Sequence, residues 1–356
     1  MKELTINGRH SVSKLLIGEA LHNLTNYLPE SRVMVIADSR VDKFYRHFYS
    51  QYPVIAAGEG EGIKNLTTVE RIYEEMLDLE ADRSWFVVGI GGGVVCDLAG
   101  YIASTYMRGL RFGFVSTSLL SQVDASLGGK NGINFKGYKN HIGTFNQPEF
   151  VICDTALLKT LPMKEVLSGF GEIVKHALIA DESMFRFLEE HYHEAVNLQP
   201  DVIEYLVYTS AVIKSGVVNR DETEKGERRV LNFGHTLAHA IEKCSSQYTH
   251  GEAVGIGMAA ATVVSLQQGR ISGETAGRIL SLLKNLGLPV KTDINKALLI
   301  DAMRHDKKRD DSEIDLVLLD GIGKCAIARS PLETTADLAN AMDMIDSQGQ
   351  ILSFND

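Results

Sequence analysis

The length, composition and charge of the chain set the first bounds on its function. With 356 residues, the chain is long enough for two domains of ordinary size, each with its own core. Hydrophobic residues make up 44% and charged residues 23%, as in a soluble globular protein. The net charge of -10 disfavours nucleic acid and anionic membranes as partners, because both attract basic surfaces.

The cysteines and the first residues indicate the compartment. The four cysteines are widely spaced and form no CxxC pair, which argues against a zinc knuckle and a disulfide framework. The first residues, Met-Lys-Glu-Leu-Thr, carry no apolar signal segment. The most apolar stretch, 253–266, is too short to span a bilayer, so we expect a buried helix there. These features predict a cytoplasmic protein.

The first 160 residues alternate apolar, β-branched runs with helical patterns. Helices are expected at 67–79 and 94–107, and strands at 32–38, 54–57, 85–90, 111–118 and 148–154. The strand at 85–90 is almost continuously apolar, which is typical of a parallel sheet buried on both faces. We therefore expect an α/β domain with a mostly parallel sheet over 1–160, and Leu161-Pro162 marks the boundary.

A glycine turn follows the strand at 85–90. Gly91, Gly92 and Gly93 precede the expected helix, where free backbone N–H groups can meet an anion. The usual dinucleotide fingerprint matches only in part, because the acid at Asp38 comes before the glycines. The turn is predicted to bind a pyrophosphate, with a purely structural turn as the alternative.

A lysine-rich stretch follows the strand at 111–118. Residues 124–141 combine four glycines with Lys130, Lys136 and Lys139 in an otherwise acidic protein. We expect a loop that binds an anion, with a solvated basic loop as the alternative.

Residues 161–356 are predicted to form a mainly α-helical domain, with a small hairpin at 313–320 and 324–329. Glu172, Lys175 and His176 share one face of an apolar helix, where a carboxylate is costly unless it is paired or binds a metal. A helix at 202–218 carries Lys214, and the charged run 219–229 reads as a solvated loop apart from particular members.

Three histidines lie close together in the sequence. His235 and His239 are four residues apart on an expected helix, so both face the same side, and His250 follows soon after. Glu172 with two of these histidines would form a three-ligand zinc site with an open position. Scattered core or surface histidines are the alternative. The cationic residues available for a small phosphorylated substrate are Lys130, Lys139, Lys175, Lys214, Arg228, Lys307 and Lys308.

At this point the chain resembles a known family over essentially its whole length. The motifs are Gly-Gly-Gly-Val-Val-Cys-Asp at 91–97, Thr-Tyr-Met-Arg-Gly at 105–109, Val-Asp-Ala-Ser-Leu-Gly-Gly-Lys at 123–130, Glu-Ile-Val-Lys at 172–175, Asn-Phe-Gly-His-Thr-Leu-Ala-His at 232–239 and His-Gly-Glu at 250–252. In this order they resemble the 3-dehydroquinate synthases of the sugar-phosphate cyclase family.

The resemblance implies a carbon–oxygen lyase of the shikimate pathway, which leads to the aromatic amino acids. Such an enzyme converts 3-deoxy-D-arabino-heptulosonate 7-phosphate to 3-dehydroquinate and phosphate. Transient oxidation by NAD is followed by phosphate elimination, re-reduction, ring opening and an intramolecular aldol closure. NAD and a divalent metal, zinc or cobalt, are the implied cofactors.

The resemblance also assigns residues. Metal binding is assigned to Glu172, His235 and His250. NAD binding is assigned to Asp38, Glu61, Lys64, Gly91, Gly92, Gly93, Asp97, Thr117, Ser118, Lys130 and Lys139. Substrate binding is assigned to Asp124, Lys130, Lys139, Asn140, Lys175, Lys214, Arg228, Asn232, His239, and Lys307 or Lys308, with Arg108 reaching into the partner's site in a homodimer. Catalytic roles are implied for Lys130, Asn140, Lys175, Lys214, Arg228 and His239.

Two departures from the commoner family pattern leave alternatives open. Asn131-Gly132 replaces a Thr-Ala pair, and His141 stands where an apolar residue is usual. A related sugar-phosphate cyclase acting on another sugar phosphate is therefore possible. A metal-dependent polyol dehydrogenase is a second class, but an uncharged polyol does not need the lysines of 130–139.

Overall fold

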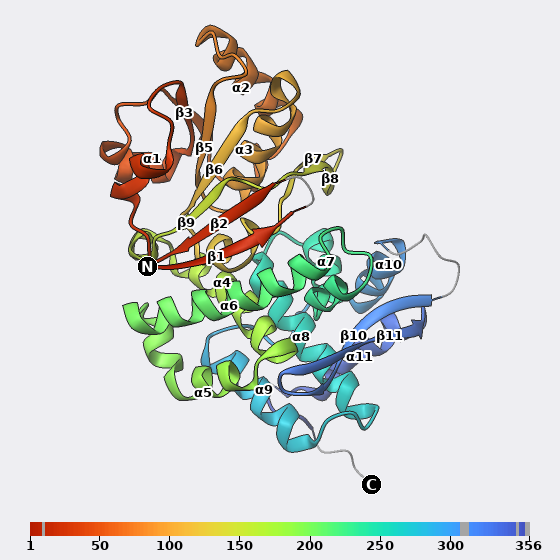
Figure 1. Cartoon of the computed structure of the whole chain (residues 1–356). Coiled ribbons are helices and arrows are strands. Elements are labelled where there is room, and N and C mark those ends of the chain that lie inside the picture. Colours follow the sequence, from red (N-terminus) through yellow and green to blue (C-terminus); the bar gives the residue numbers. More distant parts are fainter. Residues whose placement is uncertain (9–10, 307–312, 347–348, 353–356) are drawn as a thin grey trace. The chain divides into compact units, whose positions relative to one another are not determined.

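The computed structural model describes residues 1–8, 11–306, 313–346 and 349–352 (Figure 1). The chain divides into two compact units, Met1–Leu161 with Lys214–Thr223, and Pro162–Ile213 with Glu224–Asp356. The sequence predicts a single boundary after residue 160, whereas this division places Lys214–Thr223 with the first unit.

The first unit is built on a seven-stranded sheet with the order β1-β2-β9-β6-β5-β3-β4. All neighbouring strands are parallel except the first pair. The strands are β1 (Lys2–Asn7), β2 (Val12–Ile17), β3 (Val33–Asp38), β4 (Val54–Gly58), β5 (Phe86–Gly91), β6 (Arg111–Ser116) and β9 (Phe150–Cys153). The predicted α/β class and its mostly parallel sheet are confirmed.

The first two strands were not predicted from the sequence. β1 and β2 pair in antiparallel register from Lys2 opposite Ile17 to Asn7 opposite Val12. In β1 only Ile6 is buried, so a short edge strand of mostly polar residues lacks the apolar run that marks the inner strands.

The inner strands and their helices follow from the apolar pattern. Every residue of β5 is buried, because β3 and β6 flank the strand and α3 (Gly93–Thr105) packs against it. The helix α2 (Leu66–Asp78) buries Val69, Ile72 and Met76, which lie on one helical face. A short helix, α1 (Ser39–Tyr45), follows β3.

From Lys130 onward the lysine-rich stretch is not a loop, and the loop prediction was wrong there. It forms a hairpin of β7 (Lys130–Phe135) and β8 (Tyr138–Phe145), with Phe135 opposite Tyr138. The turn residues Lys136 and Gly137 both have positive φ, as a tight two-residue hairpin turn requires. The glycines of this stretch suggested a loop, but Ile133, Phe135 and Tyr138 supply strand-forming side chains.

The second unit is mainly helical, as predicted. Its helices are α4 (Met163–Ala180), α5 (Glu182–Val196), α6 (Pro200–Arg220, whose residues from Lys214 group with the first unit), α7 (His235–Cys244), α8 (His250–Gln267), α9 (Gly273–Asn285), α10 (Lys296–Asp306) and α11 (Thr334–Ala341). The predicted hairpin is confirmed as β10 (Glu313–Gly321) and β11 (Lys324–Pro331).

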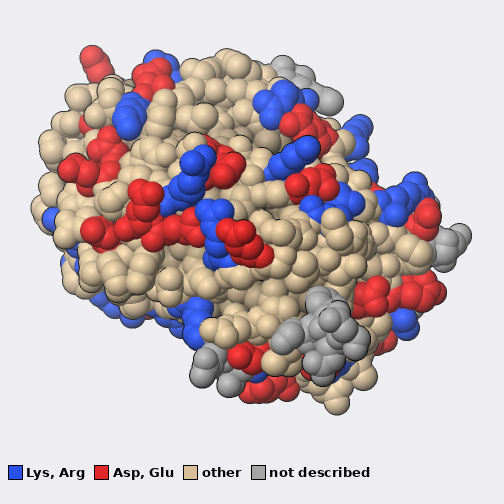
Figure 2. Space-filling view, turned by 90° about the horizontal axis from the view of Figure 1, so that it is seen from below, with Lys and Arg blue, Asp and Glu red and all other residues tan. Residues whose placement is uncertain are grey.

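Helix α8 is the central helix of this unit. It is buried from Gly251 to Ser265 except at Glu252, and it contacts α4, α7, α9, α11 and β10. Its burial on all sides explains the unbroken apolar sequence, since an amphipathic helix needs only one apolar face. None of the helices in the described part of the chain is long and apolar enough to span a membrane. On the face shown in Figure 2, basic and acidic side chains are interspersed.

Candidate functional site

Glu172 is the most deeply buried charged residue of the second unit. It lies on α4 with no exposed surface, and the ammonium of Lys175, one turn later, forms an ion pair with its Oε2. Burial alone would raise the pKa of Glu172, but Lys175 and the two neighbouring histidines hold that pKa well below its usual value. The carboxylate is therefore ionised.

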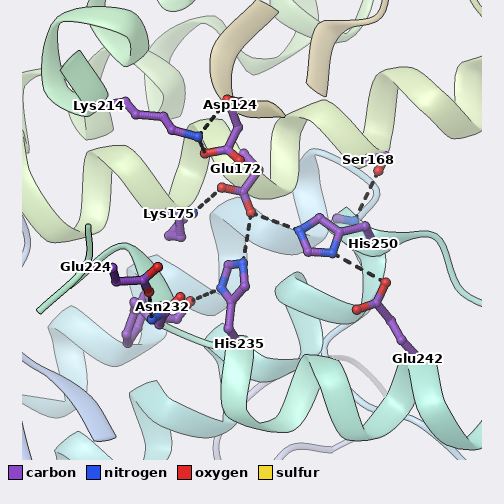
Figure 3. Close-up of polar contacts among 12 residues, drawn as sticks. Asp124, Ser168, Glu172, Lys175, Lys214, Glu224, Asn232, His235, Glu242 and His250 are labelled. Carbon is purple, nitrogen blue, oxygen red and sulfur yellow. Dashed lines mark hydrogen bonds and ion pairs between the residues drawn. The ribbon is translucent and has the colours of Figure 1, made fainter. Parts of the chain in front are cut away.

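His235 and His250 both face this carboxylate, as Figure 3 shows. Each is the first residue of its helix, α7 or α8. The Nε2 atoms lie 3.5 Å (His235) and 3.4 Å (His250) from Oε1 of Glu172. Burial and Lys175 hold the pKa of His235 well below its usual value, so this ring is neutral. For His250, contacts with Glu172 and Glu242 outweigh burial and raise the pKa to about 10.

The geometry of this cluster fits a divalent metal. Oε1 of Glu172 is buried and accepts no hydrogen bond from the described residues. Zinc bonds to nitrogen and oxygen are about 2.0–2.2 Å long, so tetrahedral ligands lie about 3.4 Å apart. The donor atoms of Glu172, His235 and His250 all lie within 4.8 Å of one another. An ion placed between them would satisfy all three.

The ring orientation of His235 is fixed by the turn before α7. Its Nδ1 lies 3.1 Å from the carbonyl oxygen of Phe233 and donates a hydrogen to it in the neutral ring, which leaves the Nε2 lone pair for a metal. Gly234 has a φ of 78°, and its backbone lies directly against Gly257 of α8. A side chain at either glycine would displace His235 from the cluster.

His250 is positioned by the start of α8. The Thr249 side chain accepts a hydrogen bond from the N–H of Glu252, and the Glu252 carboxylate accepts one from the N–H of Thr249. This capping box defines the first turn. The N–H of Gly251 donates to Oγ of Ser168 on α4 at 3.1 Å. Glu252, part of a motif noted in the sequence, thus caps the helix.

His239 lies one turn after His235 but outside the three-residue cluster. Its side chain is exposed, and the two imidazole rings meet edge to face with their centroids 5.5 Å apart. The same-face spacing of the two histidines therefore brings the rings together without placing both in the cluster with Glu172.

The remaining predicted residues of the second unit have mixed surroundings. Arg228 is only 2% exposed, in a 3-10 helix at Glu227–Asn232, so it is one of the members of 219–229 that are not solvated. Asn232 donates to Oε1 of Glu224 at 2.7 Å. Lys307 and Lys308 lie outside the described residues.

In the first unit, the glycine turn lies at the carboxyl ends of the central strands. Gly91 ends β5, Gly92 caps α3, and the N–H of Thr117 after β6 donates to the carbonyl of Gly91 at 2.9 Å. A Cβ on Gly92 would approach Oγ of Ser118 to 3.2 Å, and one on Gly93 would lie 2.7 Å from Cβ of Ala125. Both positions are therefore packed too closely against neighbouring residues to carry a side chain without a shift.

The neighbouring strand ends at Asp38. Its carboxylate caps α1 by accepting hydrogen bonds from the backbone N–H groups of Arg40 and Val41. From β3 the chain passes to β4 on one side, and β5 leads to β6 on the other. In parallel sheets such a change of direction opens a crevice in which ligands bind.

A polar network surrounds Lys64, which is 4% exposed. Its ammonium pairs with Asp97 and donates to Oδ1 of Asn140. Asn134 accepts from the N–H of Asn140 at 2.9 Å and donates to Glu61 at 2.7 Å. Burial raises the pKa of Asp97, against the opposing effect of Lys64. The network joins residues predicted for NAD to one predicted for substrate.

The other predicted residues of this unit lie on its surface or in a second ion pair. Lys214 is 6% exposed, and its Nζ lies 2.6 Å from both Oδ1 and the carbonyl oxygen of Asp124. The exposed residues are Lys130, Lys139 and Arg108.

Sequence reasoning missed two polar residues next to these clusters. Asn134 links the hairpin to Glu61, and Glu242 faces His250. Glu242 follows His235 by seven residues on α7, so helical spacing could have placed it on the same face.

Comparison with known proteins gives consistent matches. The family model for the 3-dehydroquinate synthase N-terminal part matches residues 54–168, and the C-terminal one matches 169–309. A 3-dehydroquinate synthase of Dehalococcoides mccartyi is 40% identical over 94% of this chain and 97% of its own length. A 3-dehydroquinate synthase of Thermoanaerobacter pseudethanolicus is 40% identical over 85% of this chain and 88% of its own length.

Solved structures of sugar-phosphate cyclases are also similar. A 2-deoxy-scyllo-inosose synthase complexed with carbaglucose-6-phosphate, NAD+ and Co2+ is 26% identical, with a TM-score of 0.85 over 96% of this chain and all (100%) of the other. The 2-epi-5-epi-valiolone synthase of Streptomyces hygroscopicus, with NAD+ and Zn2+ bound, is 26% identical, with a TM-score of 0.85 over 96% of this chain and 97% of the other. A probable glycerol dehydrogenase of Sinorhizobium meliloti shares the fold. It is 16% identical, with a TM-score of 0.65 over 92% of this chain and 95% of the other.

Proposed function

The chain belongs to the 3-dehydroquinate synthase family, and we propose that Glu172, His235 and His250 hold the metal for its reaction. The enzyme is a lyase that converts 3-deoxy-D-arabino-heptulosonate 7-phosphate to 3-dehydroquinate and phosphate. The observation that supports the site assignment is that donor atoms of all three side chains lie within 4.8 Å of one another.

The metal site has the form of a catalytic rather than a structural centre. Three protein ligands leave a coordination position open for substrate. A divalent cation, zinc or cobalt, supplies Lewis acidity there. The buried pair of Glu172 and Lys175 keeps the carboxylate ionised, and the Phe233 carbonyl keeps the Nε2 lone pair of His235 available. We propose that His239, which is exposed and whose ring lies against that of His235, moves a proton to or from the substrate.

NAD is the proposed second cofactor, and it supplies a hydride acceptor that is regenerated in each cycle. The turn at Gly91–Gly93, with Thr117 and Ser118 beside it, is proposed to bind the pyrophosphate, because it leads into the first turn of α3, where backbone N–H groups can meet an anion. Further NAD contacts are proposed for Asp38, Glu61, Lys64, Asp97, Lys130 and Lys139.

The phosphorylated sugar acid requires cationic and polar partners. We propose that these are Asp124, Lys130, Lys139, Asn140, Lys175, Lys214, Arg228, Asn232 and His239, with Lys307 or Lys308. Lys130 and Lys139 are exposed, and their charge suits a phosphate or a carboxylate. Lys214 and Arg228 are buried, where each charge–charge contact is stronger than in water.

The family departures at 131–141 do not favour another sugar phosphate. Asn131 is buried, lies against Gly100, and donates to the carbonyls of Gly129 and Asn146, so its role is to pack the hairpin. His141 is exposed beside Tyr138, with ring centroids 5.4 Å apart. A sugar-phosphate cyclase of different specificity remains the second candidate, because two such enzymes share the fold over the whole chain.

We further propose a cytoplasmic homodimer. Arg108 supports this proposal, because it is exposed on a turn in which Met107 and Arg108 both have positive φ. The unpaired state of all four cysteines fits a reducing compartment.

A substrate panel tests the proposed activity. The purified enzyme with zinc and catalytic NAD is given the heptulosonate 7-phosphate, glucose 6-phosphate, sedoheptulose 7-phosphate or glycerol. We expect phosphate release with the heptulosonate alone and no net NADH absorbance. Phosphate release only with another sugar phosphate would favour the second candidate, and NADH accumulation with glycerol would indicate a polyol dehydrogenase.

A further inference from the structure

We propose that Glu242 is a positioning residue that orients His250 for metal binding. The inference rests on the proposed metal site, which it extends by one residue. Glu242 lies on α7, the helix that begins with His235, and its side chain is only 9% exposed. Its Oε1 lies 3.4 Å from Nδ1 of His250 (Figure 3).

The two nitrogens of the His250 ring face two different carboxylates. Nε2 lies 3.4 Å from Oε1 of Glu172, and Nδ1 points to Glu242. Because the nitrogens point away from each other across the ring, only Nε2 can share a metal with Glu172. A carboxylate acceptor at Nδ1 holds the proton there and leaves the Nε2 lone pair for the cation.

The arrangement parallels that of His235 but differs in charge. His235 has a neutral backbone acceptor at Nδ1, the Phe233 carbonyl, whereas His250 has a carboxylate. A negatively charged acceptor makes the imidazole a stronger electron donor to a metal. The first turn of α7 therefore supplies one ligand, and its later turn orients the other.

Glu242 is not placed as a fourth ligand. The donor atoms of Glu172, His235 and His250 all lie within 4.8 Å of one another, and Glu242 does not belong to that group. Glu242 lies on the far edge of the His250 ring from Glu172. This placement predicts that removal of Glu242 weakens metal binding without changing the number of protein ligands.

The test compares zinc binding by wild type, Glu242→Gln, Glu242→Ala and the control Glu190→Gln. Glu190 is an exposed carboxylate on α5 of the same unit, outside the site. Zinc affinity is measured by competition with a chromophoric chelator, and Co2+ spectra report coordination. We expect Glu242→Ala to bind zinc about 10–100-fold more weakly, and Glu242→Gln to lose less because its amide oxygen still accepts. Glu190→Gln should match wild type.

The Co2+ spectra separate positioning from a general structural effect. In Glu242→Gln we expect shifted absorption bands with unchanged coordination number and unchanged NAD affinity. Wild-type zinc affinity in both Glu242 variants would overturn the proposal, and so would a Co2+ spectrum showing one ligand fewer. If wild type released no phosphate from any substrate while Glu242→Ala still lost zinc affinity, the proposed function would fail and this inference would stand.

Discussion

Gly171 of α4 and Gly251 of α8 meet backbone to backbone, and each adjoins a residue of the metal cluster. A Cβ on Gly171 would lie 2.5 Å from the carbonyl oxygen of Gly251. Gly171 precedes Glu172, and Gly251 follows His250. The close approach of the two helices thus sets the distance between two proposed ligands.

The substitution Gly171→Ala should separate α4 from α8. We expect the free energy of unfolding to fall by about 1–3 kcal/mol, as for other overpacked sites, together with a loss of zinc affinity. Gly277→Ala on α9 is the matched control, because no atom lies within 4 Å of its added Cβ. The control should be neutral or stabilising by up to about 1 kcal/mol. Denaturant unfolding and zinc titration check both variants, and wild-type zinc affinity in Gly171→Ala would contradict this reading.

Substitution of the two histidines of α7 should have different effects on zinc binding. His239→Ala is expected to keep stoichiometric zinc and to lose at least about 100-fold in kcat, the usual effect of removing a general acid or base. His235→Ala should lose zinc as well as turnover. Metal analysis beside steady-state kinetics distinguishes them, and zinc loss in His239→Ala would place both histidines on the metal.

Zinc binding should release about one proton near neutral pH. In the metal-free protein the pKa of His250 is raised to about 10, whereas those of Glu172 and His235 are lowered well below their usual values. At neutral pH only His250 therefore carries a proton that zinc must displace. Apparent zinc affinity should rise about tenfold per pH unit below about pH 10. Calorimetry in two buffers of different ionisation enthalpy measures the release, and a value near zero would refute the assignment.

The same raised pKa affects the stability of the metal-free protein. A group with a raised pKa in the folded state stabilises that state fully below its unfolded value, about 6.5 for histidine. This contribution is lost as the pH rises through about 10. Saturating zinc should remove this part of the pH dependence, because the metal replaces the proton.

Lys130 should act mainly on the substrate. Its exposed ammonium at the start of β7 is proposed to meet the phosphorylated sugar acid, so Lys130→Gln is expected to raise KM for substrate far more than Kd for NAD. Lys136→Asn is the control in the same hairpin, because asparagine tolerates the positive φ of that turn. Equal losses for substrate and NAD in Lys130→Gln would argue against the assignment.

Much of the fold could be predicted from local patterns. The apolar run of β5 and the spacing of Val69, Ile72 and Met76 indicated their elements because burial imposes a period on the sequence. The edge strand β1 and the β7–β8 hairpin were missed for the opposite reason. In β1 only Ile6 is buried, and the hairpin depends on strand pairing and on the turn at Lys136-Gly137.

Spacing in the sequence predicted the residue types of the site, whereas the grouping of Glu172 with His235 and His250 came only from the family resemblance. Helical spacing put His235 and His239 on one face, yet it could not show which of them approaches Glu172. Which histidine approaches Glu172 depends on two backbone contacts, Gly234 with Gly257 and Gly171 with Gly251. Each contact joins segments that lie far apart in the chain. Single-sequence patterns carry no information on such contacts.

The most direct test of the metal site is the zinc content of Glu172→Gln, His235→Ala and His250→Ala, measured with phosphate release from the heptulosonate phosphate. Wild type should hold one zinc per chain and release phosphate without net NADH. Each variant should lose both zinc and turnover, since three ligands leave no spare donor. Stoichiometric zinc of wild-type affinity in any one of these variants would contradict the proposed site.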